Sequence, residues 1–325
     1  MQKIEISAKT IIFTVFFIIL LNLLWMLKDL IFSLFIAFII MSALKPFVNF
    51  LESKKVPRLL AVLGIYFIFI GLFAELLNII FPPLIQQSAA LIKNFPAIVK
   101  SLSLQRFQFI NLNSFFQYAP NVTGQFFDLA KGFFSNTVFL ITTLFFGFYF
   151  LLEKDLIFKT VADFFDKEKL IRVTQVINKI EKRMSNWFWG ELTLMTVVGV
   201  MTFIGLNLIG IKYSLPLAVL AGLLEAVPNL GPIIAAVPMV LIGFSQSSFA
   251  GFTALALAFI VQQLENNLVV PLIMKKVVGV NPIITLIALL VGGRLAGVAG
   301  IFLAIPITLF IETIFKEITK KTGEK

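Results

Sequence analysis

The sequence predicts an all-α, polytopic integral membrane protein with broken or re-entrant helices and amphipathic surface helices. Of its 325 residues, 59% are hydrophobic and only 14% are charged, whereas soluble domains have about 45–50% apolar and about 25% charged residues. The apolar residues gather in long runs that are nearly free of charge, and a helix needs about 20 such residues to cross a bilayer. A water-soluble globule could not bury so much apolar surface.

The N-terminal half contains four such runs. Only Lys28 and Asp29 separate the first run from the second, so we expect these two to form a helical hairpin. Residues 1–81 are therefore predicted to hold the N-terminal transmembrane helices and residues 132–152 a further one. The four runs cover residues 10–27, 30–44, 59–81 and 132–152.

Two stretches of this half are predicted to be amphipathic. Residues 82–131 are apolar but broken by prolines, and Pro82-Pro83 could open a helix on the outer face of the membrane. Residues 153–186 carry charges of both signs, with apolar residues at helical spacing, which predicts a cytoplasmic amphipathic helix. The chain is predicted to end in a basic cytoplasmic tail, residues 316–325.

Residues 187–315 are predicted to form a membrane core of broken helices. The stretch from residue 226 to residue 264 has no charge but contains three prolines, and the later runs are cut by further prolines and glycines. Because proline removes a backbone donor and clashes with the preceding turn, these runs cannot all be straight helices. Broken helices or re-entrant hairpins are expected over residues 214–245 and 281–311.

The distribution of Lys and Arg predicts the topology, because these residues favour cytoplasmic loops. With both termini inside, 20 Lys and Arg residues lie on the cytoplasmic side and 6 on the outer side. Both ends of the chain are therefore expected in the cytoplasm.

An ionisable group inside a bilayer costs about 2.5 kcal/mol or more, so it normally faces a cavity, a partner or a water path. The membrane runs of this chain contain five: Glu75, Glu191, Glu225, Glu265 and Arg294. All except Glu75 fall in the broken-helix core.

Glu225 precedes Pro228, Asn229, Gly231 and Pro232, a pattern that should unwind the helix at membrane depth. Transporters use such breaks to bind substrates and coupling ions. The alternative is a proline-kinked packing element.

Gln262, Glu265 and Asn266 recur at three and four residues, which places them on one face of a regular helix. Such a polar stripe should look into a cavity, although hydrogen bonding between helices is the alternative. The glycines between residues 292 and 300 could form a second unwound region, where Arg294 would neutralise a glutamate or meet an anionic substrate.

The absent residue types exclude several functions. The chain has no Cys and no His, which excludes disulfides, thiolate catalysis, a Ser-His dyad and a zinc protease. We therefore expect no enzyme, no catalytic residues, no cofactor and no metal site. The basic residues are scattered between apolar runs, so nucleic acid is not an expected partner.

The order of several motifs resembles the AI-2E family of bacterial transporters, also called PerM-like permeases, which include autoinducer-2 exporters. The motifs are Trp-x-x-Gly-Glu at 187–191, Glu-x-x-Pro-x-x-Gly-Pro at 225–232, Gln-x-x-Glu-Asn-Asn-x-x-x-Pro at 262–271, Asn-Pro at 281–282 and the glycine-rich stretch at 292–306. The resemblance implies about eight membrane segments, secondary transport in the bacterial inner membrane and a homo-oligomer. The chain departs from the family pattern at Glu191, where Gln is expected, and at Asn281, where many members have His.

We therefore expect a secondary transporter or permease, an exporter of a small polar solute such as autoinducer-2, with sodium or proton coupling. The predicted site comprises Glu191, Glu225, Pro228, Asn229, Gly231, Gln262, Glu265, Asn266 and Arg294, and the bilayer, a solute or cation and further copies of the chain are the expected partners. A sodium/proton antiporter and a passive channel are alternatives within transport. A membrane scaffold or assembly protein is the alternative from another class.

Overall fold

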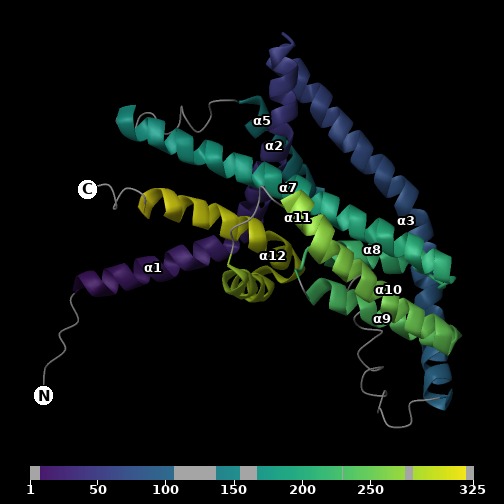
Figure 1. Cartoon of the computed structure of the whole chain (residues 1–325). Coiled ribbons are helices and arrows are strands. Elements are labelled where there is room, and N and C mark those ends of the chain that lie inside the picture. Colours follow the sequence, from purple (N-terminus) through teal and green to yellow (C-terminus); the bar gives the residue numbers. More distant parts are fainter. Residues whose placement is uncertain (1–7, 106–136, 154–166, 229, 275–280, 320–325) are drawn as a thin grey trace, which may run out of the picture.

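The computed structural model describes residues 8–105, 137–153, 167–228, 230–274 and 281–319, and its elements are all helical (Figure 1). The predicted all-α class is therefore confirmed. In chain order the elements are α1 (Ala8–Met26), α2 (Lys28–Ser53), α3 (Arg58–Gln105), α5 (Thr137–Leu152), α7 (Lys167–Ile209), α8 (Ser214–Leu224), α9 (Leu230–Gln246), α10 (Ser248–Leu264), the π-helix η1 (Glu265–Val269), α11 (Val270–Ile273) and α12 (Pro282–Thr319).

Within this described part, 6 helices are long and apolar enough to cross a membrane. They lie at Lys9–Met26, Lys28–Ser53, Arg58–Leu91, Lys169–Ile209, Ser248–Ile273 and Ala299–Glu317, and α5, α8, α9 and the first half of α12 are shorter apolar helices. The chain is a multi-pass membrane protein.

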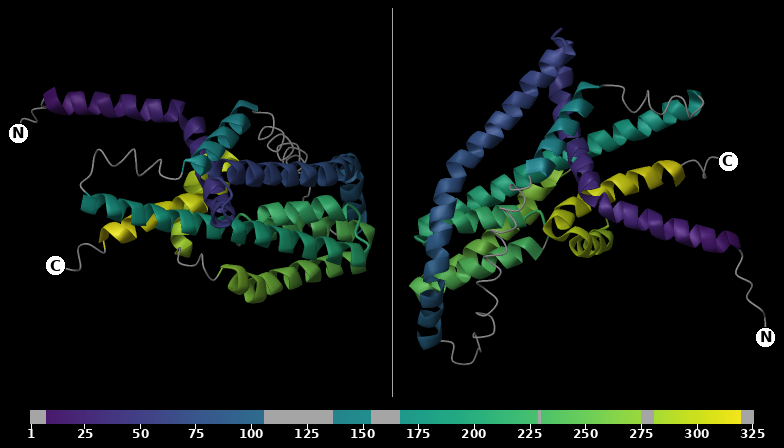
Figure 2. Two further views of the ribbon diagram at one scale, coloured as in Figure 1. Left: turned by 90° about the horizontal axis from the view of Figure 1, so that it is seen from above. Right: turned by 180° about the vertical axis from the view of Figure 1, so that it is seen from behind.

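Helix α1 projects from the rest of the molecule in all three views (Figures 1 and 2), and its apolar window is 0% buried. A helix that is apolar on every side and free of protein contacts along its length suits a lipid environment.

Helix α3 differs from the sequence expectation. A helix was expected to end near residue 81 and another to begin at Pro82-Pro83, but α3 runs without a break from Arg58 to Gln105. Proline has a helical φ, so a long apolar helix can continue through it at the cost of the missing backbone hydrogen bonds. Beyond the prolines Ser88 is buried, Leu91 packs against the α7–α10 core, and Asn94 Nδ2 donates to Tyr213 Oη over 2.9 Å. Residues 106–131 of the expected amphipathic region lie outside the described residues.

Helix α7 is a single helix where the sequence suggested a surface helix followed by a membrane helix. Its charged first half packs through Ile180 and Met184 against α2 and the end of α12. Its apolar second half packs against α8 and α10. Figure 1 shows it crossing the molecule beside α8 and α10.

Helices α7, α8, α9 and α10 surround one core of buried residues, which positions the candidate site. Small and medium side chains dominate it, so the helices approach closely. Its buried members are Leu206, Ile211, Leu217, Ala221, Ala235, Met239, Ile242, Ala250 and Ala254.

Both predicted helix breaks are present. The first separates α8 from α9, where residues 225–228 form a turn. The second lies inside α12, where Ala296 and Gly297 leave helical φ/ψ values and Gly297 has a φ of 58°. The first half of α12 begins with an Asn281 cap, whose Oδ1 accepts from the Ile283 backbone N–H over 2.9 Å. The two halves of α12 then fold back on each other as a hairpin.

Candidate functional site

Three glutamates from three different elements come together inside the helix bundle. Glu191 lies on α7, Glu225 directly follows α8, and Glu265 is the first residue of η1. Their exposed fractions are 9%, 5% and 6%. Glu265 is close enough to both other carboxyl groups to interact with them electrostatically. Acidic groups are seldom so deeply buried without a partner, so this cluster is the strongest candidate for function.

Glu191 is held by the inward face of α7. Leu194, Val198 and Leu206 are buried on the same helix at spacings of three, four and eight residues, which keeps them on one side. The preceding Gly190 lets another helix approach, since a Cβ there would stand 2.9 Å from Met274 Sδ. The end of α11 therefore lies beside Glu191.

Glu225 is held by the break between α8 and α9. Its backbone N–H still donates to the Ala221 carbonyl over 3.2 Å, and the Gly231 N–H donates to the Val227 carbonyl over 2.8 Å. A Cβ on Gly231 would stand 1.8 Å from the Leu224 carbonyl oxygen, so only glycine fits this crossing. Within the described part of the chain, the buried Glu225 Oε2 has no hydrogen-bond partner.

Glu265 is held by a π-helical turn. Such turns are rare, interrupt α-helices for a single turn and often occur at functional sites. Gln262, one turn earlier on α10, donates its Nε2 to Glu265 Oε2 over 3.0 Å. The helix thus supplies a dedicated donor for this carboxylate.

The Glu225 and Glu265 carboxyl groups lie within hydrogen-bonding reach of each other. Two ionised carboxylates offer only acceptors, so they can be held together by a shared proton or by a cation between them. The arrangement is therefore suited to bind and release one positive charge inside the membrane.

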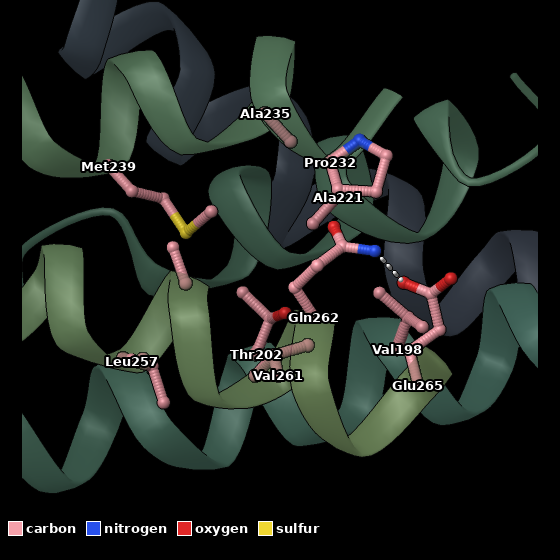
Figure 3. A pocket seen from close by; sticks show the side chains of 11 residues that line it. Val198, Thr202, Ala221, Pro232, Ala235, Met239, Leu257, Val261, Gln262 and Glu265 are labelled. Carbon is pink, nitrogen blue, oxygen red and sulfur yellow. Dashed lines mark hydrogen bonds between the residues drawn. The ribbon is translucent and has the colours of Figure 1, made fainter. Parts of the chain in front are cut away.

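A small pocket opens beside Glu265 (Figure 3). Its polar side chains are Thr202, Gln262 and Glu265, which extend from α7, α10 and η1. Its space is of the order of one or two water molecules, so a water or a bare cation fits and a larger solute requires the helices to separate. The other lining residues are Val198, Ala221, Pro232, Ala235, Met239, Leu257, Ala258 and Val261.

Among the described residues, no group of three or more His, Cys, Asp or Glu side chains is arranged to hold a metal ion. Divalent cations are usually bound by several carboxylates at once.

The other predicted site residues differ in their burial and in their distance from the three glutamates along the fold. Gly231 is buried and Pro228 is half-buried at the α8–α9 break, while Asn229 lies outside the described residues. Asn266 is exposed rather than aligned with Gln262, because the wider π turn rotates it away from the face expected in a regular helix. Arg294 is also exposed, on the first half of α12. The structure thus groups Glu191, Glu225, Gln262 and Glu265 and gives Asn266 and Arg294 exposed positions.

Sequence reasoning missed Thr202 and the apolar wall of the pocket. A signal for Thr202 exists: it lies eleven residues after Glu191 on one helix, which is three turns along the same face. The hydroxyl was overlooked because threonine is common in membrane helices, where it usually bonds to its own backbone.

Comparisons with known proteins agree with this architecture. The sequence model that describes the AI-2E transporter family matches residues 14–320 of this chain. The candidate transport protein YueF of Bacillus subtilis (strain 168) is 30% identical over 322 residues, which cover 90% of this chain and 85% of that protein. YrrI of the same strain, another candidate transport protein, is 27% identical over 335 residues, which cover 94% of this chain and 92% of that protein. The candidate permease PerM of Escherichia coli (strain K12) is 26% identical over 56% of this chain and 52% of its own length.

Proposed function

The chain belongs to the AI-2E transporter family, and from this premise we propose that it is a secondary transporter that exports a small polar solute in exchange for a proton or monovalent cation. The observation that carries the proposal is the buried Glu225–Glu265 pair beside a small pocket into which Gln262 and Glu265 extend. A site that takes up and releases one positive charge is what coupling to an ion gradient requires.

The two helix breaks support an alternating mechanism. The α8–α9 break and the bend of α12 interrupt the backbone within apolar segments, and such irregular backbone is tolerated where it is buried or lines a cavity. Movement of the α8–α9 hairpin against α7 would enlarge the pocket for a solute and uncover the carboxylates.

Autoinducer-2 is the solute class that family membership suggests, and the bacterial inner membrane is the proposed location. The distribution of Lys and Arg supports cytoplasmic termini. A homo-oligomer is proposed because family membership suggests one.

A sodium/proton antiporter is the second candidate function. The small size of the pocket favours it, since a bare cation fits this conformation without any rearrangement. The two functions differ in one measurement: an antiporter moves sodium against protons in the absence of any organic solute.

The test is flux into liposomes that contain the purified protein, measured for protons, sodium and an autoinducer-2-like solute. Glu225→Gln and Glu265→Gln keep the shape of the side chain and remove its charge, so each should lower coupled flux at least tenfold. The matched control is Glu75→Gln, which changes an exposed glutamate of the apolar helix α3. Wild-type flux in both site variants would overturn the site, and the absence of any flux from the wild-type protein would overturn the function.

A further inference from the structure

The turn between α2 and α3 carries two lysines at the boundary of the membrane. The apolar span of α2 ends at Ser53 and that of α3 begins at Arg58, so residues 54–57 lie at the level of the lipid headgroups. Lys54 and Lys55 are both exposed, and neither forms an ion pair within the described residues. Figure 1 shows this turn at the top of the molecule, where α2 meets α3.

The nearest other charged side chains are already paired with each other. Arg58 donates Nη1 to Glu52 Oε2 over 2.9 Å. Its Nη2 and Nε donate to the carbonyl oxygens of Leu151 and Leu152 at the end of α5, over 2.7 and 2.8 Å. In the described part of the chain, no acidic side chain is therefore paired with the two lysines of the turn. Uncompensated positive charge at headgroup level attracts anionic lipids.

The backbone of Lys55 adopts a conformation that favours glycine. Its φ of 68° lies in the left-handed region, where helices commonly end with a glycine. The turn is closed normally, since the Lys55 N–H donates to the Glu52 carbonyl over 2.8 Å and the Val56 N–H to the Leu51 carbonyl over 3.2 Å. A lysine at this position costs backbone free energy that glycine would not. Retention of the cation there favours an interaction partner for its side chain.

An exposed aromatic strip leads from this turn along α2. Phe47, Phe50 and Lys54 follow each other at spacings of three and four residues, which places them on one face of the helix. Phe47 and Phe50 are 46% and 62% exposed, and Lys54 Nζ lies 5.8 Å from the centre of the Phe50 ring. Seven residues of helix rise about 10 Å. The strip therefore extends from the headgroup level into the depth of the acyl chains.

Helix α7 adds a third aromatic side chain to this strip. The Trp189 ring centre lies 5.6 Å from that of Phe47, with the two planes at 69°. Trp189 is still 36% exposed, and its Nε1 donates to the Ala43 carbonyl oxygen of α2 over 3.0 Å. This hydrogen bond holds the indole in place at the crossing of the two helices. The aromatic surface thus spans α2 and α7 and has a defined shape.

We infer that this surface is a binding site for one anionic phospholipid. The two lysines would bind its phosphate, and the aromatic side chains would pack against its acyl chain, so that the lipid bridges α2 and α7. Charge complementarity selects the class, because a zwitterionic headgroup adds a cation that the lysines repel. The inference does not use the glutamate site and is independent of the proposed function. The lipid site comprises Phe47, Phe50, Lys54, Lys55 and Trp189.

The test compares two lipids with the same acyl chains, phosphatidylglycerol and phosphatidylcholine, added to the purified protein in a neutral detergent. The readouts are the lipid-bound fraction in native mass spectrometry and the rise in melting temperature, because a lipid that binds the folded state stabilises it. Phosphatidylglycerol should bind at least fivefold more tightly than phosphatidylcholine. The double variant Lys54→Gln/Lys55→Gln should lose at least tenfold of the phosphatidylglycerol affinity, since each lysine near an anionic lipid contributes about fivefold.

Three further variants locate the site. Lys54→Arg/Lys55→Arg keeps both charges and should retain phosphatidylglycerol affinity within about threefold. Phe50→Ser removes part of the acyl-chain surface and should weaken the binding of both lipids. The matched control is Lys28→Gln at the start of α2: Lys28 Nζ also stands over an aromatic ring, 4.6 Å from that of Trp25, but Asp29 follows it directly. Phosphatidylglycerol affinity should be unchanged in this control. If the double glutamine variant does not fold, Lys54→Gln alone replaces it, with an expected loss of about fivefold.

Two results would overturn the lipid site. One is equal phosphatidylglycerol affinity in the wild-type protein and the double glutamine variant, and the other is equal affinity of the wild-type protein for the two lipids. Inorganic phosphate and glycerol phosphate form a further arm: if either stabilises the protein as much as phosphatidylglycerol does, the ligand is a free anion and the lipid site is wrong. Flux measurements do not enter these outcomes, so failure of the transport function leaves this test intact.

Discussion

Gly292 and Gly300 face each other across the bend of α12 at backbone contact. A Cβ on Gly292 would stand 2.4 Å from the Gly300 carbonyl oxygen, and a Cβ on Gly300 would stand 2.0 Å from the Gly292 carbonyl oxygen. Distances this short cannot be relieved by a side-chain movement, because both obstacles are backbone atoms. The hairpin within α12 therefore depends on hydrogen at both positions.

Gly292→Ala and Gly300→Ala should each destabilise this hairpin. Overpacking of a tight contact typically costs about 1–3 kcal/mol, so a clear fall in the melting temperature of the detergent-solubilised protein is expected. Gly71→Ala on α3 is the control, since a Cβ there meets nothing within 4 Å. Unchanged melting temperatures for both hairpin variants would contradict the close approach.

Gln262→Leu should weaken the site through Glu265. Gln262 Nε2 donates to Glu265 Oε2, and leucine removes this donor while it fills a similar length with an apolar side chain. Hydrogen bonds to charged groups contribute about 1.5–3 kcal/mol, so apparent cation affinity should fall roughly tenfold to a hundredfold. The neighbouring Gln263→Leu changes an exposed residue and should have no such effect. Equal sodium affinities in the two variants would show that the amide does not position the carboxylate.

Arg183→Ala should weaken the attachment of the charged half of α7 to the end of α12. Arg183 donates Nη1 to Thr313 Oγ1 over 2.7 Å and Nη2 to Glu312 Oε2 over 2.8 Å. The expected loss of unfolding free energy is about 1–3 kcal/mol, since both acceptors are partly buried. A double-mutant cycle with Glu312→Gln measures the coupling between the two residues. Lys182→Ala, at an exposed position on the same helix, is the control and should change stability little.

The buried hydrogen bond between Ser33 on α2 and Thr143 on α5 should contribute only modestly to stability. The two hydroxyl oxygens are 2.8 Å apart, and such bonds between membrane helices average about 0.6 kcal/mol in double-mutant cycles. A cycle with Ser33→Ala and Thr143→Val should therefore give a coupling energy near this value, measured by reversible unfolding. A coupling above about 2 kcal/mol would exceed this range and contradict the expectation.

The helix breaks could be predicted because they have a local chemical cause. Pro228 and Pro232 withhold backbone donors, and Gly297 adopts a positive φ that other residues avoid. The glutamates could be proposed as site residues from the sequence, because placing an acidic side chain in an apolar membrane segment costs free energy whatever its neighbours are. Their burial and mutual proximity needed the structure.

The remaining features depend on packing that a single sequence does not display. The π turn at Glu265–Val269 adds one residue to a helical turn, and no residue type in Glu-Asn-Asn-Leu-Val demands it. The continuity of α3 through Pro82-Pro83 was unexpected because local proline rules favour a helix start there. Thr202 resembles any other threonine of a membrane helix until the pocket that it lines is seen.

The continuity of α7 has a mechanical consequence. Its 43 residues contain no proline, so it forms a rod about 64 Å long. Near its midpoint, Trp189 Nε1 donates to the Ala43 carbonyl oxygen of α2 over 3.0 Å, which can serve as a fulcrum. A rotation of about 5° around that point would move the two ends by about 3 Å in opposite directions. A displacement of the first half of α7, which Arg183 joins to α12, would therefore move Thr202 in the opposite direction.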